Sequence, residues 1–314
     1  MTGYLWDPAG SDTPLAAART DLRLGRWNSS LAVLAESRGD NRLRAHRSLV
    51  LGSAAADGNA VEQALQELPG DPDLLLLAAR VAAIRALRAD AIGSAGTQPL
   101  GRMAAQACLT AARAATQDPT PLVVLLTLAP LGYRQSLDPY GLGVPGPWDL
   151  WVRIAALDPN HREGHRRLLD AVLSLAERDG SDGVEAMWRV ANWAAATVSP
   201  DADPQLLYLV ALAEQYRRQR DPDLWSQPGV LIHCAGLFDT WFRRAGALTA
   251  PRLPVADFML VAHALIMAGP KLELEAGRVL RTVLPYAHRY PWELLGDPAT
   301  QLDNACRRVG VQPP

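Results

Sequence analysis

The chain has 314 residues and a net charge of −2, and 49% of its residues are hydrophobic. A chain of this length can bury a large core, either as two domains or as one long array of repeats. Its near-neutral charge argues against binding to nucleic acid or to an acidic membrane surface. Aromatic residues make up only 6% of the chain, whereas alanine and leucine are abundant, which favours close-packed helices over strands.

The first part of the chain predicts a series of short helices separated by turn residues. Gly25, Asp57-Gly58-Asn59 and Pro69-Gly70 interrupt helical periodicity, and Asp71-Pro72 and Asp118-Pro119 provide further boundaries. We expect helices over residues 13–24, 27–37, 40–56, 61–68, 74–91, 103–116 and 122–128. The stretch from 74 to 91 is apolar nearly all round, which predicts burial on more than one side.

Residues 131–147 form the most irregular stretch, rich in glycine and proline. Gly141-Leu-Gly-Val-Pro-Gly146 matches the letters of a dinucleotide-binding motif, but no strand pattern precedes it, and Pro145 removes an amide donor. We therefore interpret it as a plain loop. A long loop beside aromatic residues is also typical of an active-site lid.

The clearest helix boundary is the corner after the helix predicted for residues 148–157. Pro159 disfavours helical conformation at Asp158, so one helix ends there. We expect Asp158 to cap the next helix, with proline in its first turn. His161 and His165 stand four apart on that helix and could share a metal, but no third ligand is evident, so we expect a surface histidine at 161 and a packing histidine at 165.

Beyond residue 178, similar turn and helix-capping residues predict helices over 184–198, 205–219, 228–245, 253–268, 271–284 and 299–309. His233 and Cys234 are adjacent and diverge on a helix, so they cannot form a nucleophile–base pair with each other. Arginine clusters such as Arg217-Arg218 lie near predicted helix ends, where they suit the helix dipole, although arginine can also grip a carboxylate. The spacing supports no metal site, cofactor site or catalytic triad.

The corner Ala155-Ala-Leu-Asp-Pro-Asn-His161 resembles the junction between tetratricopeptide repeats. Residues 72–220 are also similar to an actinobacterial family of tetratricopeptide-like proteins, which implies a fold but no activity. The expected fold is thus an all-α superhelix of degenerate helix pairs, a single α-solenoid over residues 1–314 that can be subdivided into 1–130, the loop 131–147, and 148–314. Leu169 departs from the repeat pattern, which has a small residue there.

The resemblance implies a cytoplasmic adaptor that binds a protein or peptide in a concave groove. Its groove-facing residues would be Glu163, Arg166, Asp170, Tyr208 and Gln215. The alternative is an enzyme or small-molecule binder with a pocket lidded by residues 131–147 and lined by Tyr140, Trp148, Trp151 and His165. A third hypothesis is a structural subunit that self-associates through its end helices.

The sequence also predicts the compartment of the protein. Cys108, Cys234 and Cys306 are odd in number and lack ligand-like spacing, so we expect buried, reduced thiols. Met1–Pro8 has no signal-peptide pattern, and the longest apolar runs, of about 8 residues, are far shorter than a membrane span. We expect a soluble cytoplasmic protein.

Overall fold

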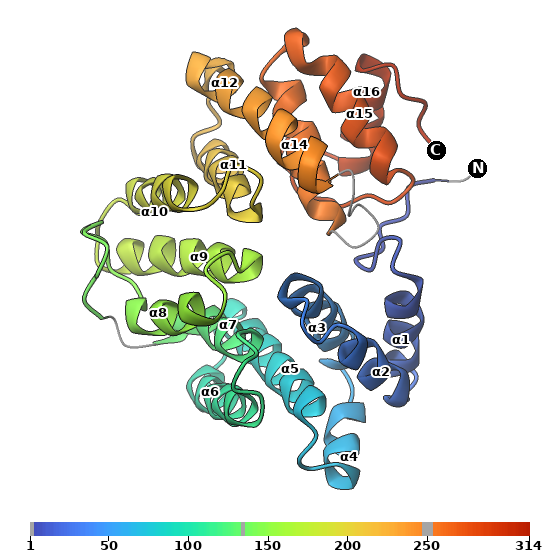
Figure 1. Ribbon diagram of the computed structural model, residues 1–314, viewed down its shortest axis with the longest axis vertical. Coiled ribbons are helices and arrows are strands. Elements are labelled where there is room, and N and C mark those ends of the chain that lie inside the picture. Colours follow the sequence, from blue (N-terminus) through green and yellow to red (C-terminus); the bar gives the residue numbers. More distant parts are fainter. Residues whose placement is uncertain (1–2, 133–135, 247–253) are drawn as a thin grey trace. The chain divides into compact units, whose positions relative to one another are not determined.

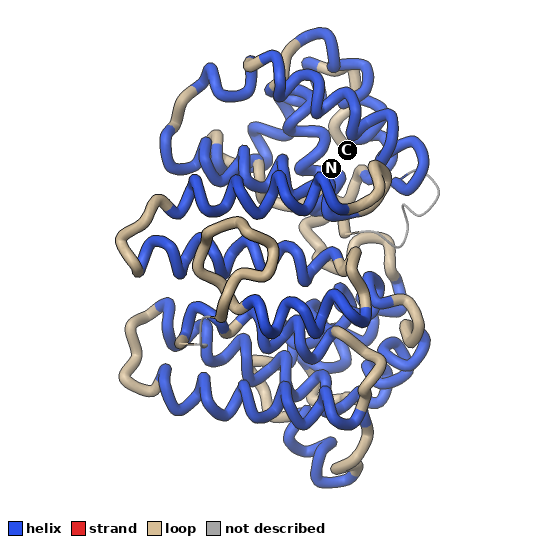
Figure 2. The backbone as a smooth tube through the Cα atoms, turned by 60° about the vertical axis from the view of Figure 1, so that its left-hand side comes forward, coloured by secondary structure: helices blue, strands red, loops and turns tan. Residues whose placement is uncertain are grey.

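A computed structural model describes residues 3–132, 136–246 and 254–314 of the chain. Throughout these residues the regular elements are helices, together with two isolated β-bridges (Figure 2). The predicted all-α class is confirmed. The chain divides into two compact units, an N-terminal unit of Thr13–Val190 and a C-terminal unit of Ala191–Pro314 with the first twelve residues.

The N-terminal unit contains nine complete α-helices and one short 3₁₀ helix among its described residues (Figure 1). The α-helices are α1 (Thr13–Arg23), α2 (Asn28–Glu36), α3 (Asn41–Ala55), α4 (Ala60–Glu67), α5 (Pro72–Ala91), α6 (Thr97–Ala114), α7 (Thr120–Thr127), α8 (Trp148–Leu157) and α9 (Arg162–Arg178), and the 3₁₀ helix is η1 (Ala129–Leu131). Helix α10 (Gly183–Thr197) crosses the boundary between the units. The glycine- and proline-rich loop lies inside this unit.

The described part of the C-terminal unit is also helical. Its longer helices are α11 (Leu207–Gln219), α12 (Pro228–Leu237), the π-helix η4 (Phe238–Gly246), α14 (Val255–Met267), α15 (Glu273–Val283) and α16 (Pro298–Arg308). Short 3₁₀ turns, η2 (Asp203–Leu206), η3 (Pro222–Ser226), η6 (Pro270–Leu272) and η7 (Trp292–Leu294), lie between them. The N-terminal segment is tied to this unit, because Leu5 exchanges backbone hydrogen bonds of 2.9 and 3.0 Å with Pro285 and Ala287.

Helix α3 has a central place in the N-terminal unit, since it packs against α5, α7 and α9 as well as α1. Gly52 allows this approach: a Cβ atom at that position would lie 2.6 Å from Cβ of Arg80 on α5. Helix α5 also packs along α6, and α7 packs against α6 and α9. The predicted burial of α5 on several sides is explained by these neighbours.

The largest difference from the expected helix boundaries is at α6, which begins at Thr97 rather than at Met103. Pro99 does not prevent this earlier start, because it lies in the first turn of α6, where proline needs no amide hydrogen bond. The three cysteines are buried free thiols, as predicted. Among the described residues, no helix combines the length and apolarity needed to cross a membrane.

Candidate functional site

The corner between α8 and α9 differs from its expected form. Asp158 does not cap α9; its carboxylate accepts from the amide of Asn160, at 3.0 Å, and from the side-chain amide of Asn41, at 3.1 Å. The cap is His161, whose Nδ1 accepts from the amide of Gly164 at 3.0 Å. His161 is also buried rather than on the surface, and this burial lowers its pKa. The neutral ring therefore has its proton on Nε2.

Glu163 forms a buried ion pair with Arg80 of α5. The guanidinium meets both carboxylate oxygens, with Nη1 2.7 Å from Oε1, and its Nε also donates to Ser48 of α3 at 3.1 Å. Burial raises the pKa of Glu163, but Arg80 and Arg167 outweigh that effect and lower the pKa to about 2. Helix α3 packs against α9 here, and Glu163 is buried and not available at the surface.

A second set of paired charges joins α3, α5 and the α6–α7 connection. Arg44 of α3 is buried, pairs with Asp73 at 2.7 Å and also bonds Asp118. A cavity of about 480 Å³ opens beside these residues, with Arg38 and Asn41 also in its lining. Arg38 pairs with Asp73 as well. Because the arginines in this cavity already have carboxylate partners, they are poorly suited to hold an additional anion.

The aromatic residues predicted to line a lidded pocket pack against one another instead. Trp151 and His165 meet edge to face, with ring centroids 4.4 Å apart, and Tyr140 meets Trp148 in the same way at 5.7 Å. Trp148, Trp151 and His165 are each at most 1% exposed. His165 Nε2 donates to the carbonyl of Pro159 at 2.8 Å, and burial lowers its pKa to about 4. His165 is therefore a neutral packing residue, as predicted.

The loop beside these aromatics is attached along its described part. The Asp138 carboxylate accepts from the amides of Tyr140 and Gly143, at 2.8 and 2.7 Å, and Arg189 donates to the carbonyl of Leu142 at 3.1 Å. Residues 133–135 of the predicted lid lie outside the described residues. The amide of Gly143 is used within the loop, which agrees with the interpretation of the glycine motif as a plain loop.

The other predicted groove residues are partly exposed. Arg166 pairs with Asp170 along α9 at 3.2 Å. Tyr208 stacks on His233 with ring centroids 3.8 Å apart, and the side chain of Gln215 donates to Gln219. Tyr208 and Gln215 belong to the C-terminal unit, whereas Arg166 and Asp170 belong to the N-terminal unit. The two pairs are thus local features of separate units.

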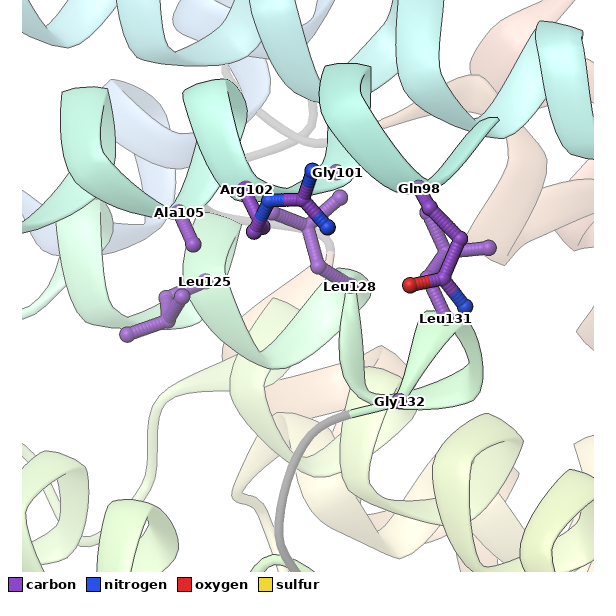
Figure 3. Close-up of a pocket in the computed structure, with 8 residues that line it drawn as sticks. All are labelled: Gln98, Gly101, Arg102, Ala105, Leu125, Leu128, Leu131 and Gly132. Carbon is purple, nitrogen blue, oxygen red and sulfur yellow. The ribbon is translucent and has the colours of Figure 1, made fainter. Parts of the chain in front are cut away.

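A more open surface follows helix α6. One cavity of about 370 Å³ is lined by Gln98, Gly101, Arg102, Ala105, Leu125, Leu128, Leu131 and Gly132. Figure 3 shows Arg102 and Gln98 reaching from α6 over the space between the helices, with Leu125, Leu128 and Leu131 on its other side. Gly101 of α6 lies beside η1, since a Cβ there would be in ordinary van der Waals contact with Leu131, at 3.7 Å. The lining is apolar with a polar rim.

A second cavity, of about 530 Å³, lies further along the same helix. It is lined by Leu109, Ala112, Arg113, Thr116, Asp118, Leu122, Arg153, Ala156 and Leu157. Its first α6 residue, Leu109, lies one turn after Ala105, the last α6 residue of the other cavity. On α7, Leu122 similarly lies one turn before Leu125. We refer to the two cavities together as the α6 groove.

The charge of the α6 groove is positive. Arg102, Arg113 and Arg153 are exposed, and none has an ion pair or side-chain hydrogen bond among the described residues. Asp118, the acid in the lining, is bonded to Arg44. The groove therefore combines an apolar floor with arginines whose charge is not offset, which suits a ligand carrying both apolar groups and carboxylates or phosphates.

These three arginines were not among the site residues predicted from the sequence. A helical pattern in the sequence could have indicated the residues that line the groove. Spacings of three and four place on one face of a helix residues 98, 101, 102, 105, 109, 112, 113 and 116. The helix expected from residue 103 leaves out the first part of this face, from residue 98 to residue 102.

The described residues contain no group of three His, Cys, Asp or Glu side chains placed to hold a metal ion. His233 and Cys234 are next to each other on α12, and burial raises the pKa of the Cys234 thiol to about 12. No protein-family model matches the sequence, and no curated protein matches it.

Proposed function

We propose that this chain is an interaction protein and that the α6 groove receives a segment of a partner protein. The observation that carries the proposal is the set of uncompensated arginines above an apolar floor. Exposed apolar surface rimmed by polar groups is typical of protein interaction sites, and arginine is enriched in them. Val152, 44% exposed one turn before Ala156, extends the apolar surface on α8.

The length of the groove favours a macromolecular segment over a small ligand. Gln98 and Thr116 are eighteen positions apart on and just beyond α6, which corresponds to about 27 Å. A compact metabolite would contact only a small part of this length, whereas a peptide segment can use successive apolar sites along it. The lidded-pocket alternative has less support, because its aromatic residues are packed together.

The proposal includes a tetratricopeptide-like arrangement of helix pairs and a cytoplasmic location. The pairing of α5 with α6 and of α14 with α15 supports the first, and the buried free cysteines support the second. The binding surface differs from the one that the resemblance implies. It lies between α6, α7 and α8, while α3 covers the expected site around Glu163.

Site-specific crosslinking in the host cell tests this proposal. A photoreactive amino acid at Ala112 lies in the groove, and the same amino acid at Gln106, exposed on α6 but outside the groove lining, is the matched control. We expect one discrete crosslinked protein from position 112 and little from position 106. No product, or the same products from both positions, would contradict a partner in the groove.

A further inference from the structure

We infer that the segment bound in the α6 groove is acidic at two separated positions and apolar between them. This inference rests on the proposed function and adds the chemistry of the partner. It follows from where the arginines lie along the groove.

The positive charges lie toward opposite ends of the groove. Arg102 and Arg113 are eleven residues apart on α6, which separates their backbones by about 16 Å. Arg153 of α8 lines the same cavity as Arg113. A guanidinium without a carboxylate partner favours binding of an anion, and its planar donors match a carboxylate with two hydrogen bonds. One end of the groove thus offers one such cation and the other offers two.

The floor between the arginines is apolar. Ala105 and Leu109 of α6 face this interval, and Leu122 and Leu125 of α7 line its other side. No unpaired acid lies in the described lining, so a basic segment would gain no ion pair there. Charge complementarity and the apolar interval together select a segment with acidic ends and an apolar middle.

A protein segment fits this pattern better than a uniform polyanion. The phosphates of nucleic acid repeat at short intervals and would place charge over the apolar interval, which has no cation to meet it. The net charge of −2 also gives a polyanion no general attraction to the chain.

Fluorescence anisotropy with labelled peptides tests the inference. Two probes have an apolar middle and glutamates about 16 Å apart, one with four intervening residues for an extended chain and one with ten for a helix. Matched probes have glutamine or lysine in place of both glutamates. We expect at least one glutamate probe to bind at least about tenfold more tightly than its glutamine counterpart.

Variants of the protein in which arginines are replaced by glutamates provide a second test of the inference. The double variant Arg102→Glu/Arg113→Glu should lose at least about tenfold in affinity for that glutamate probe and should gain affinity for the lysine probe. Arg178→Glu, an exposed position on α9 outside the groove lining, is the control and should change little. Circular dichroism confirms that each variant is folded.

Equal binding of the glutamate and glutamine probes would overturn the inference. An equal loss of affinity for the glutamate probe in the Arg178 variant would do so too. The third such result is tighter binding of a single-stranded oligonucleotide, or of anionic vesicles, than of either glutamate peptide. If any of these results is obtained while crosslinking from position 112 persists, the groove binds a partner, but the prediction of an acidic segment is wrong. If crosslinking is also absent, the proposed function fails too.

Discussion

Arg80 in the N-terminal unit and His263 in the C-terminal unit are ionisable side chains that are buried in opposite ways. In the N-terminal unit, Arg80 is 2% exposed and is matched by the carboxylate of Glu163, so both groups are charged. In the C-terminal unit, His263 is completely buried, and neither ring nitrogen has a hydrogen-bond partner in the described residues. Its ring meets Trp225 and Trp292 edge to face, with centroids 5.1 and 5.2 Å apart.

This difference shows how the surroundings decide the state of a buried group. Burial disfavours charge on both groups, but the two partners of the ion pair compensate each other. For His263 burial is the cause of the shift, and it lowers the pKa to about 3. The N-terminal unit therefore contains a charge pair that links α5 and α9, and the C-terminal unit contains a neutral ring packed between two tryptophans.

The largest expected effect is the loss of one partner of the ion pair. Glu163→Gln keeps the shape of the side chain but leaves Arg80 as a buried charge without its counter-ion. We expect the free energy of unfolding of the N-terminal unit to fall by about 3–5 kcal/mol. Urea denaturation followed by hydrogen exchange of α5 and α9 measures it.

The paired replacement Arg80→Met/Glu163→Leu is the control for this prediction. It removes both charges, so its cost should be far smaller than that of the single change, and it can even stabilise the unit. An equal loss in the single and double variants would mean that packing volume, and not the unpaired charge, sets the effect.

The pH dependence of the C-terminal unit tests the other side of the comparison. The pKa of His263 is about 3 in the folded protein and near 6.5 in the unfolded chain. Between pH 3 and pH 6.5, therefore, the imidazole is protonated only in the unfolded chain. Stability from this group is complete above pH 6.5 and is lost as the pH falls toward 3. Between pH 7.5 and 5 the loss is about 2 kcal/mol.

His263→Leu removes this proton uptake. The free energy of unfolding of the variant should fall less steeply with decreasing pH, by about 1.4 kcal/mol per pH unit at the steepest point. Denaturant titrations of both proteins at pH 7, 6 and 5 make the comparison. Parallel curves would show that His263 is not buried in its neutral form. His233, with a pKa lowered to about 4 by burial, contributes equally to both proteins.

The close contact of α3 with α5 predicts a smaller effect. Gly52→Ala would place a methyl group 2.6 Å from Cβ of Arg80, so the two helices have to separate. We expect a loss of about 1–3 kcal/mol in the free energy of unfolding. Gly58→Ala is the control, since a Cβ there meets nothing within 4 Å. A similar change in both variants would argue against tight packing at Gly52.

The smallest expected effect concerns an exposed helix cap in the C-terminal unit. Asp297 caps α16 by accepting from the amide of Thr300 at 2.8 Å. Asp297→Ala should lower the thermal midpoint of this unit by a few degrees at most, because one amide at the helix start loses its acceptor. Asp297→Asn, which retains an acceptor oxygen, should keep most of the stability that Asp297→Ala loses, as measured by thermal denaturation. A much larger drop in the thermal midpoint from Asp297→Ala would show that this corner does more than cap a helix.

Local chemistry in the sequence was enough to predict the helical class and most helix ends. Asp40 and Asp71 act as caps by accepting from backbone amides, and the helix from 148 to 157 has its predicted bounds. These features depend on residues close together in the chain, where proline, glycine and capping carboxylates act directly on the neighbouring backbone. His165 was also predicted as a packing residue.

Features that depend on distant residues were decided only by the tertiary structure. The sequence around Glu163 does not show that α3 covers it or that Arg80, 83 positions earlier, supplies its charge partner. Likewise, Arg113 and Arg153 become neighbours of one cavity only when α6 and α8 pack around α7. A helical pattern indicates which residues share a face, but the burial of that face and the pairing of its charges depend on which helix packs against it.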